Sequence, residues 1–417
     1  MYDKHTLANG MRIIGERITH VNSVSIGIWI KTGSRNETPE NSGVSHFIEH
    51  MLFKGTKNRS AKEIAACIDN VGGQLNAFTS KESTCYYVKV LDTHLDLAVE
   101  VISDMINKSV FDEKEMGKER GVIIEEIGMY EDNPEEMVHD ILTNIIWNND
   151  PLGMPILGTK ETLEAMDRFT LIDFMKEHYT PDNMVFSISG NYNFENLISL
   201  VEEKFGNMLN TEGKGKELKA PVFTPAIFKK QKSIEQIHYC IGFDAYPYGH
   251  RLYFPLIILS NLFGGAMSSR LFQRIREEMG LAYSVFSYTS NFADCGLFCI
   301  YAGMNPSQYD LVVEVIGEEI QKLLVHGVNE EELYNAKEQL KGSYILGLES
   351  TSGRMISLGK NLIMQNKTHT PKEILAKIEK VDMVEIQETI NDVFKNKKHG
   401  RASIGNFRAK NKDKIKK

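Results

Sequence analysis

The sequence predicts an α+β protein of two duplicated domains, each a mostly antiparallel sheet covered by helices. Three observations lead to this fold class. At 417 residues with 42% hydrophobic content, the chain is long enough for two cores. Strand-like and helix-like stretches alternate along each half. Stretches of the first half also recur in the second half at a nearly constant spacing, as expected for a duplication.

The repeated stretches define the proposed domains. Residues 93–102 resemble residues 307–316, which aligns Asp96 with Asp310 at an offset of 214. Residues 186–191 resemble residues 401–406 at an offset of 215. Between the halves, glycines, prolines and lysines crowd residues 211–231 and interrupt regular structure. We therefore predict an N-terminal domain at 1–211, a linker at 212–232 and a C-terminal domain at 233–417.

Local periodicity identifies the first elements within each domain. Residues 23–30 and 85–90 alternate with period two, which predicts strands with one buried face. Residues 95–106 have the apolar spacing of a helix. The strands pair more naturally as hairpins and meanders than as βαβ units. We therefore expect mostly antiparallel sheets with helices on one face.

Composition limits the classes of function. The net charge of −8 argues against general nucleic-acid binding. We expect no membrane-spanning helix and no secretory signal, because no apolar run is long enough and the first residues lack an apolar core. Five scattered cysteines suggest reduced thiols in a cytoplasmic protein, and core packing explains Cys295 and Cys299 better than metal binding does. The C-terminal lysines are interpreted as a solvated tail: Lys410, Lys412, Lys414, Lys416 and Lys417.

The segment His46-Phe47-Ile48-Glu49-His50 is the strongest chemical signal. On a helix His46 and His50 share one face, and Glu49 lies beside them. This His-x-x-Glu-His order is the inverzincin signature of zinc hydrolases. Composition alone gives about 0.05 chance matches per chain. A solvated helix with two surface histidines is the alternative, but the apolar flanks indicate a buried helix, where such groups need a partner or a metal.

A third zinc ligand is expected downstream, since catalytic zinc takes three protein ligands and leaves one position for water. Glu119 and Glu126 lie two helical turns apart on one face, whereas Glu125 points about 100° away from Glu126. The neighbouring apolar residues Val122, Ile123, Ile127 and Met129 predict a packed helix. The other acids of this region are interpreted as ordinary surface residues: Glu125, Glu131, Glu135 and Glu136.

His46-x-x-Glu49-His50, followed 76 residues later by Glu126, resembles the pitrilysin family of zinc metallopeptidases. The chain is most similar to the bacterial processing proteases and the mitochondrial processing peptidase β subunit. The resemblance extends over essentially the whole chain, including residues 7–10, 72–79, 268–272 and 280–285. It implies a processing-peptidase-like metallohydrolase fold and one Zn²⁺ per chain. It also implies that His46, His50 and Glu126 bind the zinc and that Glu49 is the base.

The resemblance also points to residues that contact a peptide. A strand after Gly72-Gly73 is expected to bind substrate by β-augmentation, through Asn76, Ala77 and Phe78. Without the zinc motif, this segment would be interpreted as a plain edge strand.

In the second half, the resemblance implies that Arg276 and Tyr283 lie over the substrate and support the developing oxyanion. By themselves they would be interpreted as an ion-paired arginine and a core tyrosine. Arg274 is a neighbouring alternative for the arginine. Residues 256–263, which match the zinc helix, contain no histidine pair. We therefore expect no metal in the second domain.

Together these features predict a cytoplasmic zinc-dependent endopeptidase that hydrolyses short or unfolded peptides. Glu49 is expected to act as general base, and Glu119 to orient a ligand or the water. Four-domain members of the family close like a clamshell, so this two-domain chain is expected to form a homodimer with composite active sites. No nucleic acid or membrane partner is expected. The sequence carries no determinant of cleavage-site preference.

Two other functions remain open from the sequence. One is a non-catalytic structural or peptide-binding subunit of the same fold, although such relatives typically have a broken motif. The other is a zinc lyase acting on S-ribosylhomocysteine. That family shares His-x-x-Glu-His but has a much shorter domain and a cysteine as third ligand.

Overall fold

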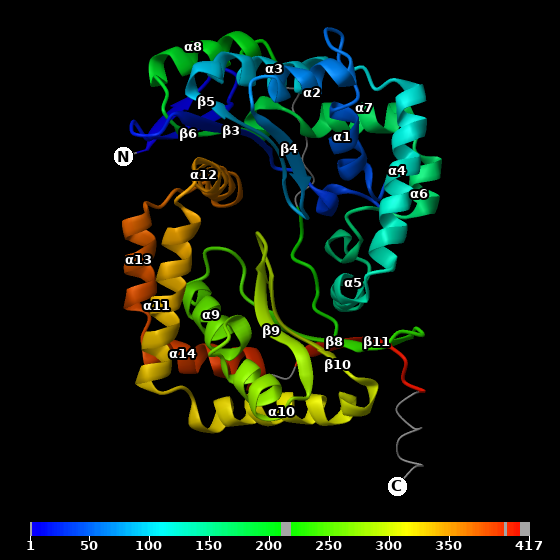
Figure 1. Ribbon diagram of the computed structural model, residues 1–417, viewed down its shortest axis with the longest axis vertical. Coiled ribbons are helices and arrows are strands. Elements are labelled where there is room, and N and C mark those ends of the chain that lie inside the picture. Colours follow the sequence, from blue (N-terminus) through cyan, green and yellow to red (C-terminus); the bar gives the residue numbers. More distant parts are fainter. Residues whose placement is uncertain (1, 210–217, 396–397, 409–417) are drawn as a thin grey trace. The chain divides into compact units, whose positions relative to one another are not determined.

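The computed structural model describes residues 2–209, 218–395 and 398–408, and the chain divides into two compact units (Figure 1). Each unit takes one segment from the other half of the sequence. Unit 1 comprises Met1–Gly128, Met154–Leu218 and Ile345–Thr370. Unit 2 comprises Met129–Gly153, Lys219–Tyr344 and Pro371–Lys417.

Unit 1 contains a six-stranded sheet in the order β1-β2-β6-β3-β5-β4. All neighbouring strands are antiparallel except β2 and β6, which are parallel. Strand β4 lies at one edge and pairs with β5. The strand bounds are β1 Asp3–Thr6, β2 Arg12–Arg17, β3 Ser23–Ile30, β4 Gln74–Thr79, β5 Thr84–Leu91 and β6 Met184–Gly190.

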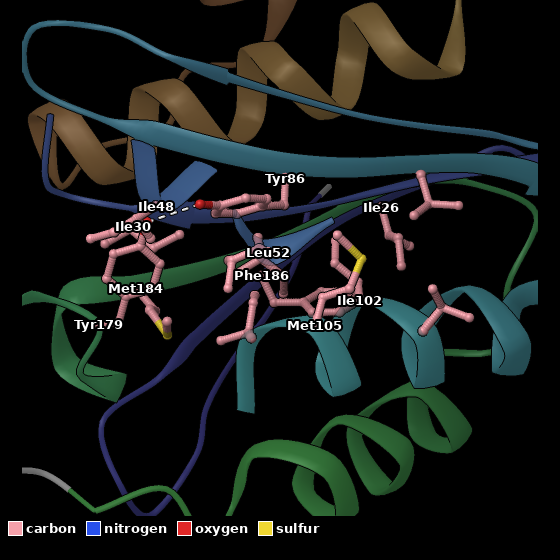
Figure 2. Packing of buried hydrophobic residues seen from close by; sticks show 14 of the residues in the cluster. Ile26, Ile30, Ile48, Leu52, Tyr86, Ile102, Met105, Tyr179, Met184 and Phe186 are labelled. Atoms are coloured by element: carbon pink, nitrogen blue, oxygen red, sulfur yellow. Dashed lines mark hydrogen bonds between the residues drawn. The ribbon is translucent and has the colours of Figure 1, made fainter. Parts of the chain in front are cut away.

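Helices pack on one face of this sheet and enclose the main core of unit 1 (Figure 1). The core includes Ile26 of β3, Ile48 and Met105, and a hydrogen bond of 2.9 Å joins the buried hydroxyls of Tyr86 and Tyr179 (Figure 2). The α-helices that the first half of the sequence contributes to this unit are α1 Val44–Leu52, α2 Ala61–Asp69, α3 Leu95–Lys108, α4 Glu113–Glu131, α6 Lys160–Ala165, α7 Arg168–His178 and α8 Phe194–Phe205.

The opposite face of the sheet is covered by α12 (Thr351–Gln365), which belongs to the second half of the sequence (Figure 1). The hydroxyls of Ser25 and Thr351 lie 2.9 Å apart, and a Cβ on Gly359 would lie only 1.9 Å from Nε1 of Trp29. Strand β3 is consequently buried on both faces. The expectation that helices cover one face was therefore wrong, because a covering helix so distant in sequence leaves no local signal.

Unit 2 repeats the same topology in a five-stranded sheet ordered β7-β11-β8-β10-β9. The parallel pair β7–β11 matches β2–β6, and the other pairs are antiparallel. The two sequence repeats fall on equivalent elements, α3 with α10 (Tyr309–His326) and β6 with β11. The strands are β7 Ile227–Gln231, β8 Ile237–Ala245, β9 Ala282–Asn291, β10 Gly296–Met304 and β11 His399–Gly405. The predicted duplicated α+β fold is confirmed.

The sheet of unit 2 also separates two apolar layers. One face packs against α10 and the other second-half helices that belong to unit 2. The other face packs against α5 (Pro134–Ile146), which comes from the first half of the sequence. The remaining helical segments are α9 Tyr253–Ser260, α11 Glu330–Gly347, α13 Pro371–Lys380, α14 Met383–Ile390, and the π-helical η5 Asn261–Gly265, η6 Phe272–Glu278 and η8 Asn391–Lys395.

The predicted linker at 212–232 contains strand β7, and its residues 212–217 lie outside the described part of the chain. The predicted lysine tail at 410–417 lies outside it as well. The domain limits at 211 and 233 therefore stay a prediction. No helix within the described ranges has the length and apolar character needed to span a membrane.

Candidate metal centre

The helix that carries the histidine motif, α1, begins at a tightly defined turn. Gly43 precedes it with φ of 94°, and a Cβ there would lie 2.7 Å from the carbonyl oxygen of Leu157. The buried carboxylate of Glu37 accepts hydrogen bonds from the backbone N–H groups of Gly43 (2.7 Å) and Ser45 (2.9 Å). These contacts satisfy donors that a helix start leaves unpaired, so they fix where the helix begins.

Helix α1 is buried along most of its length, as its apolar flanks predicted. His46 is buried, with 8% of its surface exposed, and His50 is partly buried one turn later. Burial, together with the charge of the neighbouring His50, lowers the pKa of His46 to about 3. The imidazole is therefore neutral, which leaves a nitrogen lone pair for a metal.

Helix α4 carries the third candidate metal ligand, Glu126. Its inward face bears Met116, Glu119 and Ile123, with the partly buried Glu126 on the next turn. Val122 and Met129 do not belong to a packed face, because their exposed fractions are 49% and 74%. Their apolar character had suggested otherwise, and only the observed helix phase separates them from Ile123. The surface assignment of Glu125, Glu131, Glu135 and Glu136 agrees with their exposure.

His46 and His50 of α1 lie close to Glu126 of α4, although the two helices are far apart in the sequence. Nε2 of His46 lies 3.8 Å from Oε2 of Glu126, and Nε2 of His50 lies 3.7 Å from the same oxygen. Two ligand atoms about 2.1 Å from a zinc ion at the tetrahedral angle are separated by about 3.4 Å. The three donor atoms all lie within 4.8 Å of one another. Two imidazoles and a carboxylate in this arrangement fit a catalytic zinc site.

Glu119 contacts this centre through His50. Its Oε2 lies 3.1 Å from Nδ1 of His50, and its Oε1 lies 2.7 Å from Nζ of Lys54. A proton on Nδ1 of His50 directs the lone pair of Nε2 toward Glu126. Nδ1 of His46 has no hydrogen-bond partner within the described ranges. Within the described ranges, the two imidazoles therefore differ: Nδ1 of His50 has a carboxylate partner, and Nδ1 of His46 has no hydrogen-bond partner.

Glu49 lies beside the three donors and is held by strand β4. Its carboxylate accepts a hydrogen bond from the hydroxyl of Thr79, the last residue of that strand. Burial raises the pKa of Glu49, and the hydrogen bond from Thr79 opposes that shift only in part. A carboxylate with a raised pKa is suited to exchanging protons near neutral pH.

The predicted peptide-binding residues lie on β4, whose outer edge does not pair with another described strand. Asn76 is exposed, and its Oδ1 accepts a hydrogen bond from the backbone N–H of Ala77. The side chain of Phe78 points to the α12 face and packs edge-on against Trp29, with ring centroids 5.5 Å apart. The structure therefore gives Phe78 a packing role, while the edge of β4 that faces away from β5 pairs with no described strand.

Arg276 and Tyr283 lie together in unit 2. The guanidinium of Arg276 stacks over the Tyr283 ring at 5.0 Å and over the Phe272 ring at 4.7 Å. Tyr283 is 77% exposed, so it is not the core tyrosine that its sequence context alone suggested. Arg274, the alternative arginine, is paired with Glu278 one turn away on its own helix. Helix α9 occupies the place of the motif helix in unit 2 and has no histidine.

Three residues of this centre were not identified from the sequence: Glu37, Lys54 and Thr79. Lys54 follows His50 by four residues, a spacing that could have indicated a shared helical face. Thr79 is two residues beyond Ala77 and so lies on the same side of β4. Glu37 leaves no sequence signal, because it contacts α1 across a turn.

Two family models match this chain. The model described as "Insulinase (Peptidase family M16)" matches residues 12–160, and the model "Peptidase M16 inactive domain" matches residues 165–340. The chain belongs to peptidase family M16. The predicted membership in the insulinase and pitrilysin group is thereby confirmed. The second match also agrees with a second domain that lacks the histidine motif.

The M16 chain has relatives that it covers almost completely. It is 46% identical over 394 residues to the "uncharacterized zinc protease YmxG" of Bacillus subtilis, spanning 94% of this chain and 96% of that protein. It is 39% identical over 400 residues to an "uncharacterized zinc protease" of Streptomyces coelicolor, spanning 93% and 86%.

Solved structures show the same fold. A protease from Helicobacter pylori matches with a TM-score of 0.89 at 24% identity, covering 97% of this chain and 99% of that one. A peptidase M16 inactive domain from Pseudomonas fluorescens matches with a TM-score of 0.90 at 15% identity, covering 97% and 98%. These two structural similarities support the assignment of the fold. The proposed chemistry depends on the residues of the candidate metal centre.

Proposed function

We propose that this M16 protein is a zinc-dependent endopeptidase. The observation that carries the proposal is the convergence of His46, His50 and Glu126, with Glu49 beside them. Helix α1 supplies two metal-ligand atoms and α4 supplies one, so neither helix alone provides the three protein ligands of a catalytic zinc. The names of the relatives, which are zinc proteases, support the same metal.

The chemistry follows from these residues. His46, His50 and Glu126 would hold one Zn²⁺ per chain, which supplies a Lewis acid for the scissile carbonyl and acidifies water. Glu49 accepts the proton of the attacking water and delivers it to the leaving nitrogen. Thr79 keeps the Glu49 carboxylate oriented through its hydrogen bond. Glu119 is a positioning residue that acts through His50.

The substrate is proposed to be a short or unfolded peptide that adds to the edge of β4. Thr79 ends this strand at Glu49, so a peptide paired with β4 is carried toward the base. Pairing through the main chain recognises an extended backbone more than particular side chains. Asn76 and Ala77 supply the backbone contacts, and Phe78 supports the strand from its other face.

The proposed enzyme is a cytoplasmic homodimer with composite sites. In this proposal Arg276 and Tyr283 of one chain act on a peptide held at the zinc of the other. A guanidinium and a phenol suit the stabilisation of an oxyanion. The Tyr283 ring is exposed and carries the stacked guanidinium of Arg276, so both groups are accessible to a ligand.

A non-catalytic, peptide-binding subunit of the same fold is the second candidate. Such a protein would need no base beside the metal. The complete set of His46, His50, Glu126 and Glu49, supported by Glu119, favours catalysis. A zinc lyase acting on S-ribosylhomocysteine is disfavoured, because the third ligand here is the carboxylate of Glu126 and not a thiol.

Metal analysis combined with a fluorogenic peptide tests the function. Glu49→Gln is expected to retain zinc and to lose at least about a hundredfold in turnover, because it removes the base but no ligand. His50→Ala is expected to lose both zinc and turnover. Glu125→Gln, an exposed neighbour of Glu126, serves as the matched control and should behave like wild type. A Glu49→Gln enzyme with normal turnover would falsify the proposal.

A further inference from the structure

Unit 2 contains a second cluster of metal-binding side chains, far along the sequence from the histidine motif. Among the described residues, His139, Cys240 and Cys299 offer one donor atom each, all within 4.8 Å of one another. The three residues come from α5, β8 and β10. All three elements belong to unit 2, so the cluster lies within one compact body.

The strand register explains how the cysteines meet. In the β8–β10 pair, Cys240 lies opposite Tyr301, and Cys299 is two residues before Tyr301 on the same strand. Residues two apart on a strand share a face, so both thiols point to the same side of the sheet. This is the side covered by α5, which presents His139. Both cysteines are fully buried.

The distances suit a shared cation. Nδ1 of His139 lies 3.3 Å from Sγ of Cys240. A nitrogen about 2.0 Å and a sulfur about 2.3 Å from one tetrahedral zinc are separated by about 3.5 Å. The hydroxyl of Tyr288, which lies opposite Cys299 in the β9–β10 register, is 2.7 Å from the same nitrogen. This contact is a hydrogen bond, which an ion bound to Nδ1 of His139 would displace.

The surroundings exclude water from most of the cluster. The His139 ring packs against the rings of Phe286, Tyr288 and Tyr301, with centroids between 5.3 and 6.2 Å away. Two thiolates and a neutral imidazole around a divalent ion give a net charge of zero, which a buried site tolerates. Thiolate and imidazole donors together select thiophilic ions such as zinc.

We propose that His139, Cys240 and Cys299 form a second metal site, which holds a structural Zn²⁺. The ion would tie α5 to the sheet of unit 2. It joins chain segments that are 101 and 59 residues apart, so it would oppose detachment of a helix contributed by the other half of the sequence. The core-packing interpretation of Cys299 would then be incomplete, whereas that of Cys295, which lies outside the trio, stands.

Zinc content and a cobalt spectrum test the site without relying on activity. Wild-type protein purified under reducing conditions should contain two zinc ions per chain. The proposed catalytic site has only nitrogen and oxygen donors, so sulfur-to-cobalt charge-transfer absorption after Co²⁺ exchange would report the second site alone. Both results come from unmodified protein, so they do not depend on the folding of a variant.

Variants assign the signals. Cys240→Ser/Cys299→Ser should lose one zinc and the charge-transfer absorption, and its melting temperature should fall. Cys295 is a buried cysteine of the same apolar layer, so Cys295→Ser is the matched control. It should retain both zinc ions and the charge-transfer absorption. His46→Ala should lose the other zinc and keep the absorption. One zinc per wild-type chain, no charge-transfer absorption, or a Cys240–Cys299 disulfide in place of a metal would each overturn the proposal.

Discussion

Two carboxylates of the M16 centre, Glu49 and Glu119, have different tasks because they have different partners. Glu49 faces the converging donors and is held by one hydroxyl, whereas Glu119 is enclosed between His50 and Lys54. The lysine compensates the buried charge of Glu119, so this carboxylate is kept as an acceptor for the imidazole N–H. In the proposed mechanism, Glu119 sets the tautomer of His50, and Glu49 exchanges the proton.

Glu119→Gln tests this positioning role. The variant is expected to bind zinc about 10- to 100-fold more weakly, because an amide supports the His50 tautomer less well than a carboxylate. At saturating zinc, turnover should recover most of its wild-type value. Zinc affinity measured by competition with a chelator, together with kcat at high zinc, separates the two effects. An unchanged affinity would leave Glu119 without the proposed role.

Glu37 makes the stability of unit 1 depend on pH. Burial raises the pKa of Glu37 from 4.5 to about 7, although hydrogen bonds from Gly43 and Ser45 oppose the shift. The folded state therefore holds a proton that the unfolded chain releases, so the free energy of unfolding falls as pH rises from 4.5 to 7. The full effect is on the order of 3 kcal/mol.

Glu37→Gln should remove this dependence. Between pH 5 and pH 8, the melting temperature of the variant is expected to change less than that of wild type. The variant also loses one acceptor for the start of α1, so its stability at pH 5 should be lower. Thermal unfolding at several pH values measures the pH dependence of the melting temperature and the stability at pH 5. The exposed Glu125→Gln is the control. Parallel curves for Glu37→Gln and wild type would contradict the assignment.

At the scale of elements, β4 is the strand to which we propose that a peptide substrate adds. It is an edge strand whose last residue, Thr79, is hydrogen-bonded to Glu49, so a peptide paired with the strand would be held close to the proposed base. The N–H of Ala77 donates to the side chain of its own neighbour, Asn76. A peptide strand could replace that local acceptor when it pairs with the edge.

Ala77→Pro tests peptide addition to β4. Proline removes the N–H at this position, and an edge strand tolerates it where that N–H is not used by the sheet. We expect KM for an extended peptide to rise about tenfold, with a smaller effect on kcat. Steady-state kinetics and zinc content are the measurements. Gln74→Ala, an exposed change on the same strand, is the control, and equal KM values would argue against β-augmentation here.

At the scale of the whole molecule, the proposed catalytic groups are divided between the two halves of a duplicated chain. The first half carries the metal-binding side chains on α1 and α4. In the second half, α9 has no histidine, and Arg276 and Tyr283 lie together. The proposed composite site uses this division. Each chain of a homodimer would supply a zinc half to one site and an Arg276/Tyr283 half to the other.

Mixed dimers test the composite site. Glu49→Gln chains lack the base, and Tyr283→Phe chains lack the phenol, so each homodimer should be nearly inactive. A heterodimer of the two has one site with both groups intact, and about half of wild-type activity per dimer is expected. Differently tagged chains allow verified heterodimers to be purified and assayed. Absence of rescue in such heterodimers would exclude complementation between chains.

Local sequence determined the features of this protein that depend on periodicity. The spacing of His46, Glu49 and His50 requires only a helix to put them together, and the same holds for Glu119 and Glu126. The alternation at residues 23–30 and the repeat offsets of 214 and 215 likewise predicted β3 and the duplicated fold. These signals are readable because helix and strand geometry relates residues that are close in the chain.

Only the tertiary structure decided which helices meet and which faces are covered. The approach of α4 to α1, the contact of Thr79 with Glu49 and the covering of β3 by α12 join residues distant in sequence. The same is true of α5, which brings His139 to Cys240 and Cys299. Such contacts depend on burying apolar faces of whole elements against each other, and a non-directional force of this kind leaves no spacing rule in the sequence.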